Sequence, residues 1–365
     1  AVHGQAQARR LRRKDATGFD RGVERGGFQR DHVAAIEDAA PLAARIDGFL
    51  RDLATRDLGG RLLTRLVSAF NDRLSGRVIE LTACRHRLPA VPWCWLALGS
   101  EGRHEQTFIS DQDNGLIFSA TDRHEADALR QLFLPFAQEV NRHLDECGFA
   151  LCSGGIMAGN PAWCLSLDEW KQKFIEWVRR PEPAALLNAS IFFDLRPLYG
   201  ESDLGDALRQ LMLSLTRDNP AFLHLMAANA LQAPAPLNYR GELAAEAGAA
   251  GSELDLKKFG SRIFVDAARI FALASGVPAV NTSERLSVAG RAAGLQDHEI
   301  SAIDAGFAHV LRLRLAHQVA AAGGDVAAGH RVPLAGLNEL DHVILKESLK
   351  QARRLQQRLK LNYGL

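Results

Sequence analysis

The most informative segment of the chain is residues 92–118, PWCWLALGSEGRHEQTFISDQDNGLIF. Its first part, residues 92–98, is a short apolar run that ends at a glycine, which is typical of a buried strand. Residues 108–118 end in a second apolar run, and we predict a strand there as well. The middle of this second strand is polar, although a buried strand gains nothing from charged groups. The segment therefore predicts two strands, the second of which carries charged residues for a purpose other than stability.

Two carboxylates make up this polar middle. Asp111 and Asp113 are two positions apart, and on a strand such residues point to the same side while Gln112 faces away. Two carboxylates held side by side repel each other unless a cation lies between them or one is protonated. Because oxygen ligands select hard ions, the pair predicts a site for Mg²⁺ or Mn²⁺.

The turn before the aspartates carries groups suited to phosphate. Gly99 and Ser100 follow the first strand and Gly102 is close behind, so backbone N–H groups can approach phosphate oxygens. Ser100 adds a hydroxyl, and Arg103 adds a forked cation that matches phosphate geometry. Phosphate donors and metal ligands thus come from neighbouring segments, as phosphoryl or nucleotidyl transfer requires. We therefore predict that Gly99, Ser100 and Arg103 bind phosphate.

A third carboxylate usually completes a site of this kind, and Asp194 is the best candidate. It is the only acid in the apolar segment 191–198, which we interpret as a strand. Beside Asp111 and Asp113, it would be the third catalytic residue and metal ligand. Arg196 falls on the same face two residues later, so a structural ion pair between Asp194 and Arg196 is the alternative.

The rest of the chain predicts an α+β fold. Apolar residues at spacings of three and four predict helices within residues 31–83 and after Asp122 and Ser166, each of which begins a capping box. A further strand is expected near residues 149–157. Beyond residue 205 the pattern is helical almost throughout.

Three regions follow from these patterns. Residues 1–30 hold a basic run among Gly, Gln and Asp, and we predict a mobile arm there. Residues 31–205 would form a mixed β-sheet domain with flanking helices, and residues 206–365 an all-α helical bundle. A chain of 365 residues exceeds one ordinary domain, which agrees with this division.

Composition argues against several classes of function. The net charge is +1, so no global signal points to a nucleic-acid partner. No segment approaches the roughly 20 apolar residues that span a bilayer, so no membrane partner is expected. The five cysteines form no Cys-x-x-Cys pair and favour a reducing compartment, from which we predict a cytoplasmic location. P-loop, dinucleotide-binding and acyl-hydrolase signatures are missing.

Gly99-Ser100 followed by Asp111-x-Asp113 resembles the signature of the DNA polymerase beta-like nucleotidyltransferase superfamily. The longer string Gly-Ser-x-Gly-Arg-x-Glu-Gln-Thr, with Ser-Asp-Gln-Asp-Asn after it, is similar to one branch, the nucleotidyltransferases called DUF294. That branch is similar in turn to the PII uridylyltransferases and the glutamine-synthetase adenylyltransferases. Further matches lie at residues 154–158, 160–164, 192–196, 255–257 and 312–318.

The resemblance implies a nucleotidyltransferase-type sheet domain followed by a helical substrate-binding domain. It implies that the turn at residues 99–103 holds a triphosphate and that Asp111 and Asp113 bind two divalent ions. Asp194 would ligate one metal and help to deprotonate the acceptor hydroxyl. The helical domain would shape the acceptor pocket.

The predicted function is transfer of a nucleoside monophosphate from a nucleoside triphosphate (NTP) to an acceptor hydroxyl, with Mg²⁺ or Mn²⁺ as cofactor and pyrophosphate released. The acceptor would be a regulatory protein, as the resemblance to PII uridylyltransferases implies, or a small molecule. The alternative is a non-catalytic, nucleotide-sensing module for signal transduction, which binds an NTP and transfers nothing.

Overall fold

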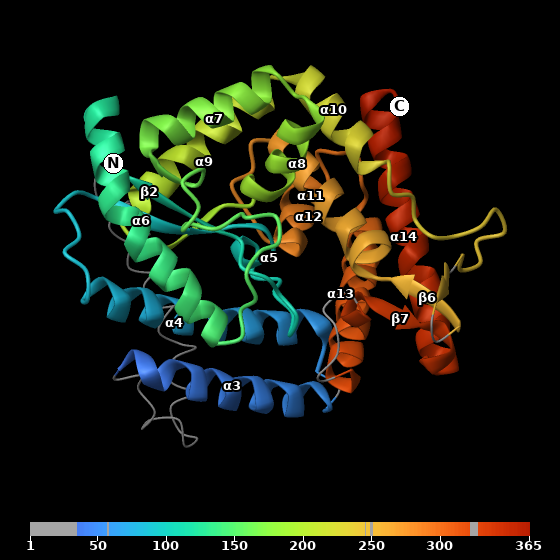
Figure 1. The fold of residues 1–365 in the computed structure, drawn as a ribbon. Helices are drawn as coiled ribbons and strands as arrows, with labels where there is room; N and C mark the ends of the chain where they lie inside the picture. Colours follow the sequence, from blue (N-terminus) through green and yellow to red (C-terminus); the bar gives the residue numbers. More distant parts are fainter. Residues whose placement is uncertain (1–34, 57, 245, 249–250, 322–327) are drawn as a thin grey trace, which may run out of the picture.

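The computed structural model describes residues 35–365 apart from residues 57, 245, 249–250 and 322–327. It has the predicted α+β architecture, a mixed β-sheet with flanking helices followed by a helical C-terminal part (Figure 1). The arm predicted at residues 1–30 lies outside the described residues. Across the described residues, no helix has both the length and the apolar character needed to cross a membrane.

The central sheet consists of β1 (Trp93–Ala97), β2 (Asn114–Phe118), β3 (Cys164–Ser166) and β4 (Arg196–Gly200). Their order in the sheet is β3-β2-β1-β4. β1 pairs antiparallel with both β2 and β4, whereas β2 pairs parallel with β3. The predicted strand at residues 92–98 is therefore a central strand, and the polar turn after it leads to its neighbour β2.

The helices of the N-terminal part are α3 (Ala39–Ala54), α4 (Gly60–Ala83), α5 (Gly99–Gly102), α6 (Arg123–Glu146), α7 (Leu167–Arg179), α8 (Pro183–Phe192) and α9 (Ser202–Arg217), preceded by the 3-10 turn η2 (Ile36–Asp38). Ser166 and Glu169 form the reciprocal capping box predicted for α7. At the start of α6, the Asp122 carboxylate accepts the Glu125 N–H at 2.9 Å. Pro135 lies inside α6 without ending it.

Helices cover both faces of the sheet. Trp95 and Phe118 belong to a core cluster on one face, together with residues of α4 and α6. Leu96 and Ile117 belong to a second cluster on the other face, which includes residues of α7 and α9. Because neighbouring residues of a strand point to opposite faces, a strand buried on both sides is apolar at successive positions. This explains the continuous apolar run in β1.

The C-terminal part is helical, as predicted, and also contains a small sheet that the sequence analysis did not predict. Its helical elements are α10 (Pro220–Ala230), the π-helical turn η3 (Lys257–Ser261), α11 (Arg262–Ala274), α12 (Thr282–Ala289), α13 (Asp297–Ala320), the 3-10 turns η4 (Ala328–His330) and η5 (Leu334–Gly336), and α14 (Glu339–Tyr363). The strands β5 (Glu246–Gly248), β6 (Gly251–Asp255) and β7 (Arg331–Pro333) pair antiparallel in that order.

The sheet and the helical part share one hydrophobic core. Leu96 of β1 and Phe264 of α11 belong to the same cluster of buried side chains. α13 packs against α4 as well as against α14. A Cβ atom at Gly60 would lie 2.4 Å from the Ala308 carbonyl oxygen, so glycine permits the close approach of α4 to α13. Both parts therefore contribute walls to the cleft described below.

One of the predicted strands is absent, and two others are only partly correct. Residues 108–113 precede β2 and are not part of it, and residues 149–157 contain no strand. Residues 191–198 hold the end of α8 and the start of β4, so Asp194 lies between a helix and a strand. A short apolar run fits a buried helix as well as a buried strand, which explains the error at α8.

Candidate active site

The turn after β1 lies directly against the aspartate pair. Gly99 begins the one-turn helix α5 with φ of +53°, in the left-handed region that favours glycine. A Cβ atom at Gly99 would lie 2.7 Å from Oδ2 of Asp113. Glycine is therefore required both by the backbone conformation and by the approach of the carboxylate. The predicted phosphate-binding turn and a predicted metal ligand are direct neighbours.

Asp111 and Asp113 reach the site from an extended segment just before β2. Gln112 between them is buried, and its amide donates to the carbonyls of Asn141 and Phe149 at 2.9 and 2.8 Å. Gln112 thus anchors the segment in the protein interior. The two aspartates line the cleft instead, as expected for alternate positions of an extended chain.

Asp111, Asp113 and Cys152 form a possible metal site. One ligand atom from each residue lies within 4.8 Å of the others, and no second group of this kind occurs among the described residues. Cys152 comes from the loop after α6, which is held to β2 by a bond from the Asn114 N–H to the Ile156 carbonyl at 3.1 Å. Sequence reasoning missed Cys152 because nothing in its spacing connects it with the aspartates.

The two carboxylates repel each other. Burial and the neighbouring charge of Asp111 raise the pKa of Asp113 to about 7, although Lys257 and Arg103 act in the opposite direction. A divalent ion between the two carboxylates would remove their repulsion. Carboxylate oxygens are also the ligands that Mg²⁺ and Mn²⁺ prefer. Asp111 and Asp113 therefore fit such an ion.

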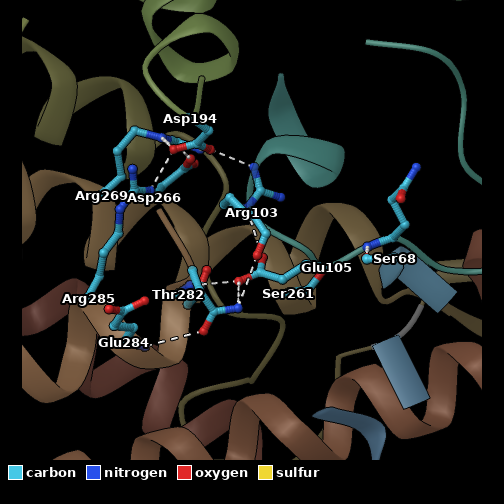
Figure 2. A network of polar contacts seen from close by, with 12 residues as sticks. Ser68, Arg103, Glu105, Asp194, Ser261, Asp266, Arg269, Thr282, Glu284 and Arg285 are labelled. Carbon is cyan, nitrogen blue, oxygen red and sulfur yellow. Dashed lines mark hydrogen bonds and ion pairs between the residues drawn. The ribbon is translucent and has the colours of Figure 1, made fainter. Parts of the chain in front are cut away.

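Asp194 does not join this pair. Its carboxylate is fully buried and is enclosed by three arginines, as Figure 2 shows. Oδ1 accepts from Arg269 Nε at 3.0 Å and Arg285 Nη1 at 2.5 Å, and Oδ2 accepts from Arg103 Nη1 and Arg269 Nη2, both at 2.6 Å. Burial alone would raise the pKa of Asp194, but the arginines lower it well below its usual range.

These contacts correct the predicted role of Asp194. Both of its oxygens are engaged by guanidinium groups, so neither is available to a metal ion. A carboxylate with a strongly lowered pKa is also a weak base, which does not suit deprotonation of an acceptor hydroxyl. The structure brings together Asp111 and Asp113 but places Asp194 in a separate, ionic network.

The network around Asp194 connects the two parts of the chain. Arg103 follows α5, whereas the other two arginines lie on α11 and α12. Glu105 extends the network, because its Oε2 accepts from Arg103 Nε at 2.8 Å and its Oε1 accepts the Thr282 N–H at 2.7 Å (Figure 2). Removing one member would leave another buried charge uncompensated. The network therefore holds α11 and α12 against the turn that carries Arg103.

Arg196 has a different partner from the one considered in the sequence analysis. Its Nη2 donates to the Asp72 carboxylate on α4 at 2.8 Å and to the Glu101 carbonyl at 3.2 Å. The suggested ion pair between Asp194 and Arg196 is therefore wrong. Glu101 is buried beside this pair, and burial together with the charge of Asp72 raises the pKa of Glu101 to about 8.

A cleft with a volume of about 270 Å³ lies between the sheet and the helical part. Its walls combine the turn and the aspartates with residues of η3, α11 and α13. Asp111 and Asp113 are partly exposed, so the pair is accessible from the cleft. The lining includes every predicted phosphate-binding residue and both aspartates: Gly99, Ser100, Arg103, Asp111 and Asp113 from the sheet side, and Lys257, Ser261, Arg262, Arg269 and Arg314 from the helical side.

This arrangement defines a class of protein, in which a sheet domain with a Gly-Ser turn and two aspartates faces a helical domain across a cleft. Two family models match the chain: "Putative nucleotidyltransferase DUF294" over residues 44–184, and "Putative nucleotidyltransferase substrate binding domain" over residues 220–363. The chain belongs to this nucleotidyltransferase family, as its sequence motifs indicated. No curated protein sequence matches it. The predicted domain boundary at residues 205–206 falls between the two matched regions and stays a prediction.

Proposed function

We propose that the cleft catalyses metal-dependent transfer of a nucleoside monophosphate from an NTP to an acceptor hydroxyl. The observation that carries the proposal is the placement of Asp111 and Asp113 beside the turn at Gly99 and Ser100 in one cleft. Family membership supports nucleotidyl transfer over other phosphoryl transfers. Metal dependence rests on the fit of the two carboxylates to a divalent ion.

In the proposed reaction, the acceptor oxygen forms a bond to the α-phosphorus. The bond between the α-phosphorus and the oxygen bridging to the β-phosphate breaks, pyrophosphate leaves, and the hydroxyl proton is lost to solvent. Asp111 and Asp113 would hold the Mg²⁺ or Mn²⁺ ions. Ions bound there lower the pKa of the acceptor hydroxyl and neutralise the leaving group. Ser100 and the N–H groups of the turn would position the triphosphate.

Arg103 would bind phosphate, and Asp194 would hold the Arg103 side chain in place. Two nitrogens of Arg103, Nε and Nη1, donate to Glu105 and Asp194. For the third, Nη2, no hydrogen-bond partner occurs in the described ranges of the chain, and the side chain lines the cleft. Asp194 would therefore act as a positioning residue that fixes the guanidinium plane, rather than as a metal ligand.

The acceptor would bind against the helical part. The second family model is described as a substrate-binding domain, and its match includes the whole helical wall of the cleft. The resemblance to PII uridylyltransferases supports uridylylation of a regulatory protein, which would bring its hydroxyl to the rim of the cleft. A small-molecule acceptor is the other option, since a cleft of about 270 Å³ is near the lower end of small-molecule sites.

Release of pyrophosphate tests the proposal. The full chain is incubated with Mg²⁺ or Mn²⁺ and each of the four ribonucleoside triphosphates, with and without candidate acceptors, and released pyrophosphate is measured. Asp111→Asn and Asp113→Asn are expected to abolish release, because each removes a carboxylate from the pair. Asp145→Asn, at an exposed position of α6, is the matched control and should retain activity. Metal-dependent turnover that survives both substitutions in the pair would refute the proposal.

One observation favours the alternative, a non-catalytic nucleotide sensor. Asp194 is engaged elsewhere, so the metal site has two carboxylates where the resemblance implies three. A sensor would bind an NTP with its divalent ion and retain it unchanged. Calorimetry that detects nucleotide binding, together with no pyrophosphate release across candidate acceptors, would support the sensor over the transferase.

A further inference from the structure

Arg314 on α13 is a buried arginine without an ion-pair partner in the part of the chain that the structure describes. Only 7% of the residue is exposed. Its Nη1 donates to the Ser261 hydroxyl at 3.1 Å, and its buried Nε makes no hydrogen bond. Burial lowers the pKa of Arg314 to about 10, and the charge of Asp255, which forms no ion pair with it, offsets this only in part. The guanidinium is therefore poorly compensated within the chain.

Three other arginines of this region each have a carboxylate partner. Arg103, Arg269 and Arg285 all donate to the same carboxylate, that of Asp194. A buried charge without such a partner costs free energy, because the water it has lost is not replaced. The contrast indicates that the partner of Arg314 is a group that the described residues do not supply. Since the group is a cation with free donors, that molecule is an anion.

Arg314 faces the same cleft as the aspartate pair, and Lys257 of η3 lies nearby. Lys257 is exposed to the cleft and forms no ion pair with the described residues. Lys257 and Arg314 line the same cleft as Asp111 and Asp113. The two cations and the two aspartates therefore face a common space.

We propose that Arg314 and Lys257 bind the β- and γ-phosphates of the NTP on the helical wall of the cleft. The inference rests on the proposed function, because it assigns the triphosphate tail to the wall opposite the metal ligands. Metal ions at Asp111 and Asp113 would then contact one side of the phosphates and the two cations the other. Arg314 would bind through Nη2, which makes no hydrogen bond to the described residues, while the Ser261 hydroxyl holds Nη1 in place.

The backbone of η3 supports this assignment. Residues 257–261 form a π-helical turn, and such turns occur often at functional sites. A Cβ atom at Gly260 would lie 3.0 Å from Cγ1 of Val310, so the turn is packed closely on α13. This packing brings the Ser261 hydroxyl to Arg314 and sets Lys257 at the cleft. Both proposed phosphate-binding side chains, Lys257 and Arg314, are therefore carried by helical elements rather than by a loop.

Inorganic tripolyphosphate with Mg²⁺ is a suitable probe, because it requires no knowledge of the base. Its affinity is measured by calorimetry for the full chain and for Arg314→Met, Arg314→Lys and Lys257→Met. Arg314→Met should weaken binding by about ten- to hundredfold, the range for a hydrogen-bonded charged contact, and Arg314→Lys should lose less. Arg312→Met is the matched control, since Arg312 lies on the same helix but pairs with Asp341 outside the cleft. It should bind the probe as the unsubstituted chain does.

Stability separates a ligand-binding arginine from a structural one. Because Arg314 pairs with no carboxylate among the described residues, Arg314→Met should unfold at the same or a higher denaturant concentration than the unsubstituted chain. A large loss of stability would instead identify Arg314 as structural and overturn the proposal. The affinity for tripolyphosphate is also measured in Lys257→Met and Arg314→Lys. If neither substitution changes that affinity, the proposal is overturned as well.

The outcomes also separate this inference from the proposed function. Tripolyphosphate binding that depends on Arg314, without pyrophosphate release from any NTP, would support the phosphate site and refute the transferase. Turnover that depends on Asp113, with tripolyphosphate affinity unchanged in Arg314→Met, would support the transferase and refute the phosphate site. Arg314→Met could also raise the KM for the acceptor and leave the KM for the NTP unchanged. This result would refute the phosphate site, because Arg314 would then bind an anionic group of the acceptor. Absence of tripolyphosphate binding by the unsubstituted chain would refute it directly.

Discussion

Asp113 is a partly buried carboxylate and Asp194 a fully buried one, and their surroundings have opposite effects. Asp113 lies beside another acid, and burial with that charge raises its pKa to about 7. Asp194 lies among three arginines that lower its pKa. A carboxylate of the first kind gains from a bound cation, whereas one of the second kind is already neutralised. At the residue scale, this difference supports the proposed metal binding by Asp113 and an anchoring role for Asp194.

The substitution Asp194→Asn should destabilise the fold strongly. It leaves three buried guanidinium groups around a neutral amide, and breaking a buried ion pair in this way costs about 3–5 kcal/mol. The free energy of unfolding is measured by urea denaturation. Asp168→Asn is the control, because Asp168 is exposed and pairs with Lys171 at the surface, and its loss should stay within about 0.5 kcal/mol. Similar values for the two variants would contradict the anchoring role.

The raised pKa of Glu101 predicts a dependence of stability on pH. In the folded protein the pKa of Glu101 is about 8, against an ordinary value of 4.5, so between these pH values the folded state holds a proton that the unfolded state has released. The contribution of Glu101 to the free energy of unfolding is therefore full below pH 4.5 and is lost above pH 8. Between these pH values it falls by at most about 1.4 kcal/mol per pH unit.

Glu101→Gln isolates this effect, since glutamine cannot ionise. The free energy of unfolding is measured for the variant and the unsubstituted chain from pH 5 to pH 8.5. The stability of the variant relative to the unsubstituted chain should increase steadily with pH. Parallel curves over this range would show that Glu101 does not titrate in the way its burial implies.

At the element scale, the turn formed by α5 couples the sheet to the metal site. Gly99→Ala places a methyl group 2.7 Å from the Asp113 carboxylate and in a backbone conformation with φ of +53°. The conformation alone costs about 1–2 kcal/mol, and displacement of the carboxylate should weaken metal binding. Gly48→Ala is the matched control, because Gly48 lies in α3 with no atom within 4 Å of its Cβ position. That change should stabilise the fold by about 0.5–1 kcal/mol. Equal effects on unfolding would contradict the strained turn.

The elements differ in how well the sequence predicts them. β1 and the capping box at Ser166 were predicted correctly, because a continuous apolar run and a capping pattern are local signals. Asp194 was misplaced on a strand, since the apolar residues before it suit a helix equally well. Its partners could not be predicted, because the arginines of α11 and α12 meet it only through tertiary packing. Cys152 was missed for the same reason.

At the scale of the whole molecule, the site exists only where two parts of the chain meet. The motif residues 99–113 were predictable as a unit, because they lie close together in the sequence. The opposite wall comes from residues 257–314, and no local pattern shows that it faces the aspartates. The shared core and the network around Asp194 fix this arrangement (Figures 1 and 2). The position of Arg314 in the same cleft as the aspartates is therefore an observation that the structure adds.

Binding of Mn²⁺, followed by electron paramagnetic resonance, tests the central claim most directly. The full chain should bind Mn²⁺. Asp111→Asn and Asp113→Asn should each lower the affinity for Mn²⁺ by roughly tenfold or more, because even the loss of a residue that only hydrogen-bonds to a metal ligand has an effect of this size. Asp194→Asn, assayed where it remains folded, should bind Mn²⁺ with unchanged affinity. Unaltered binding in Asp111→Asn and Asp113→Asn, or an equal loss in Asp194→Asn, would contradict the account.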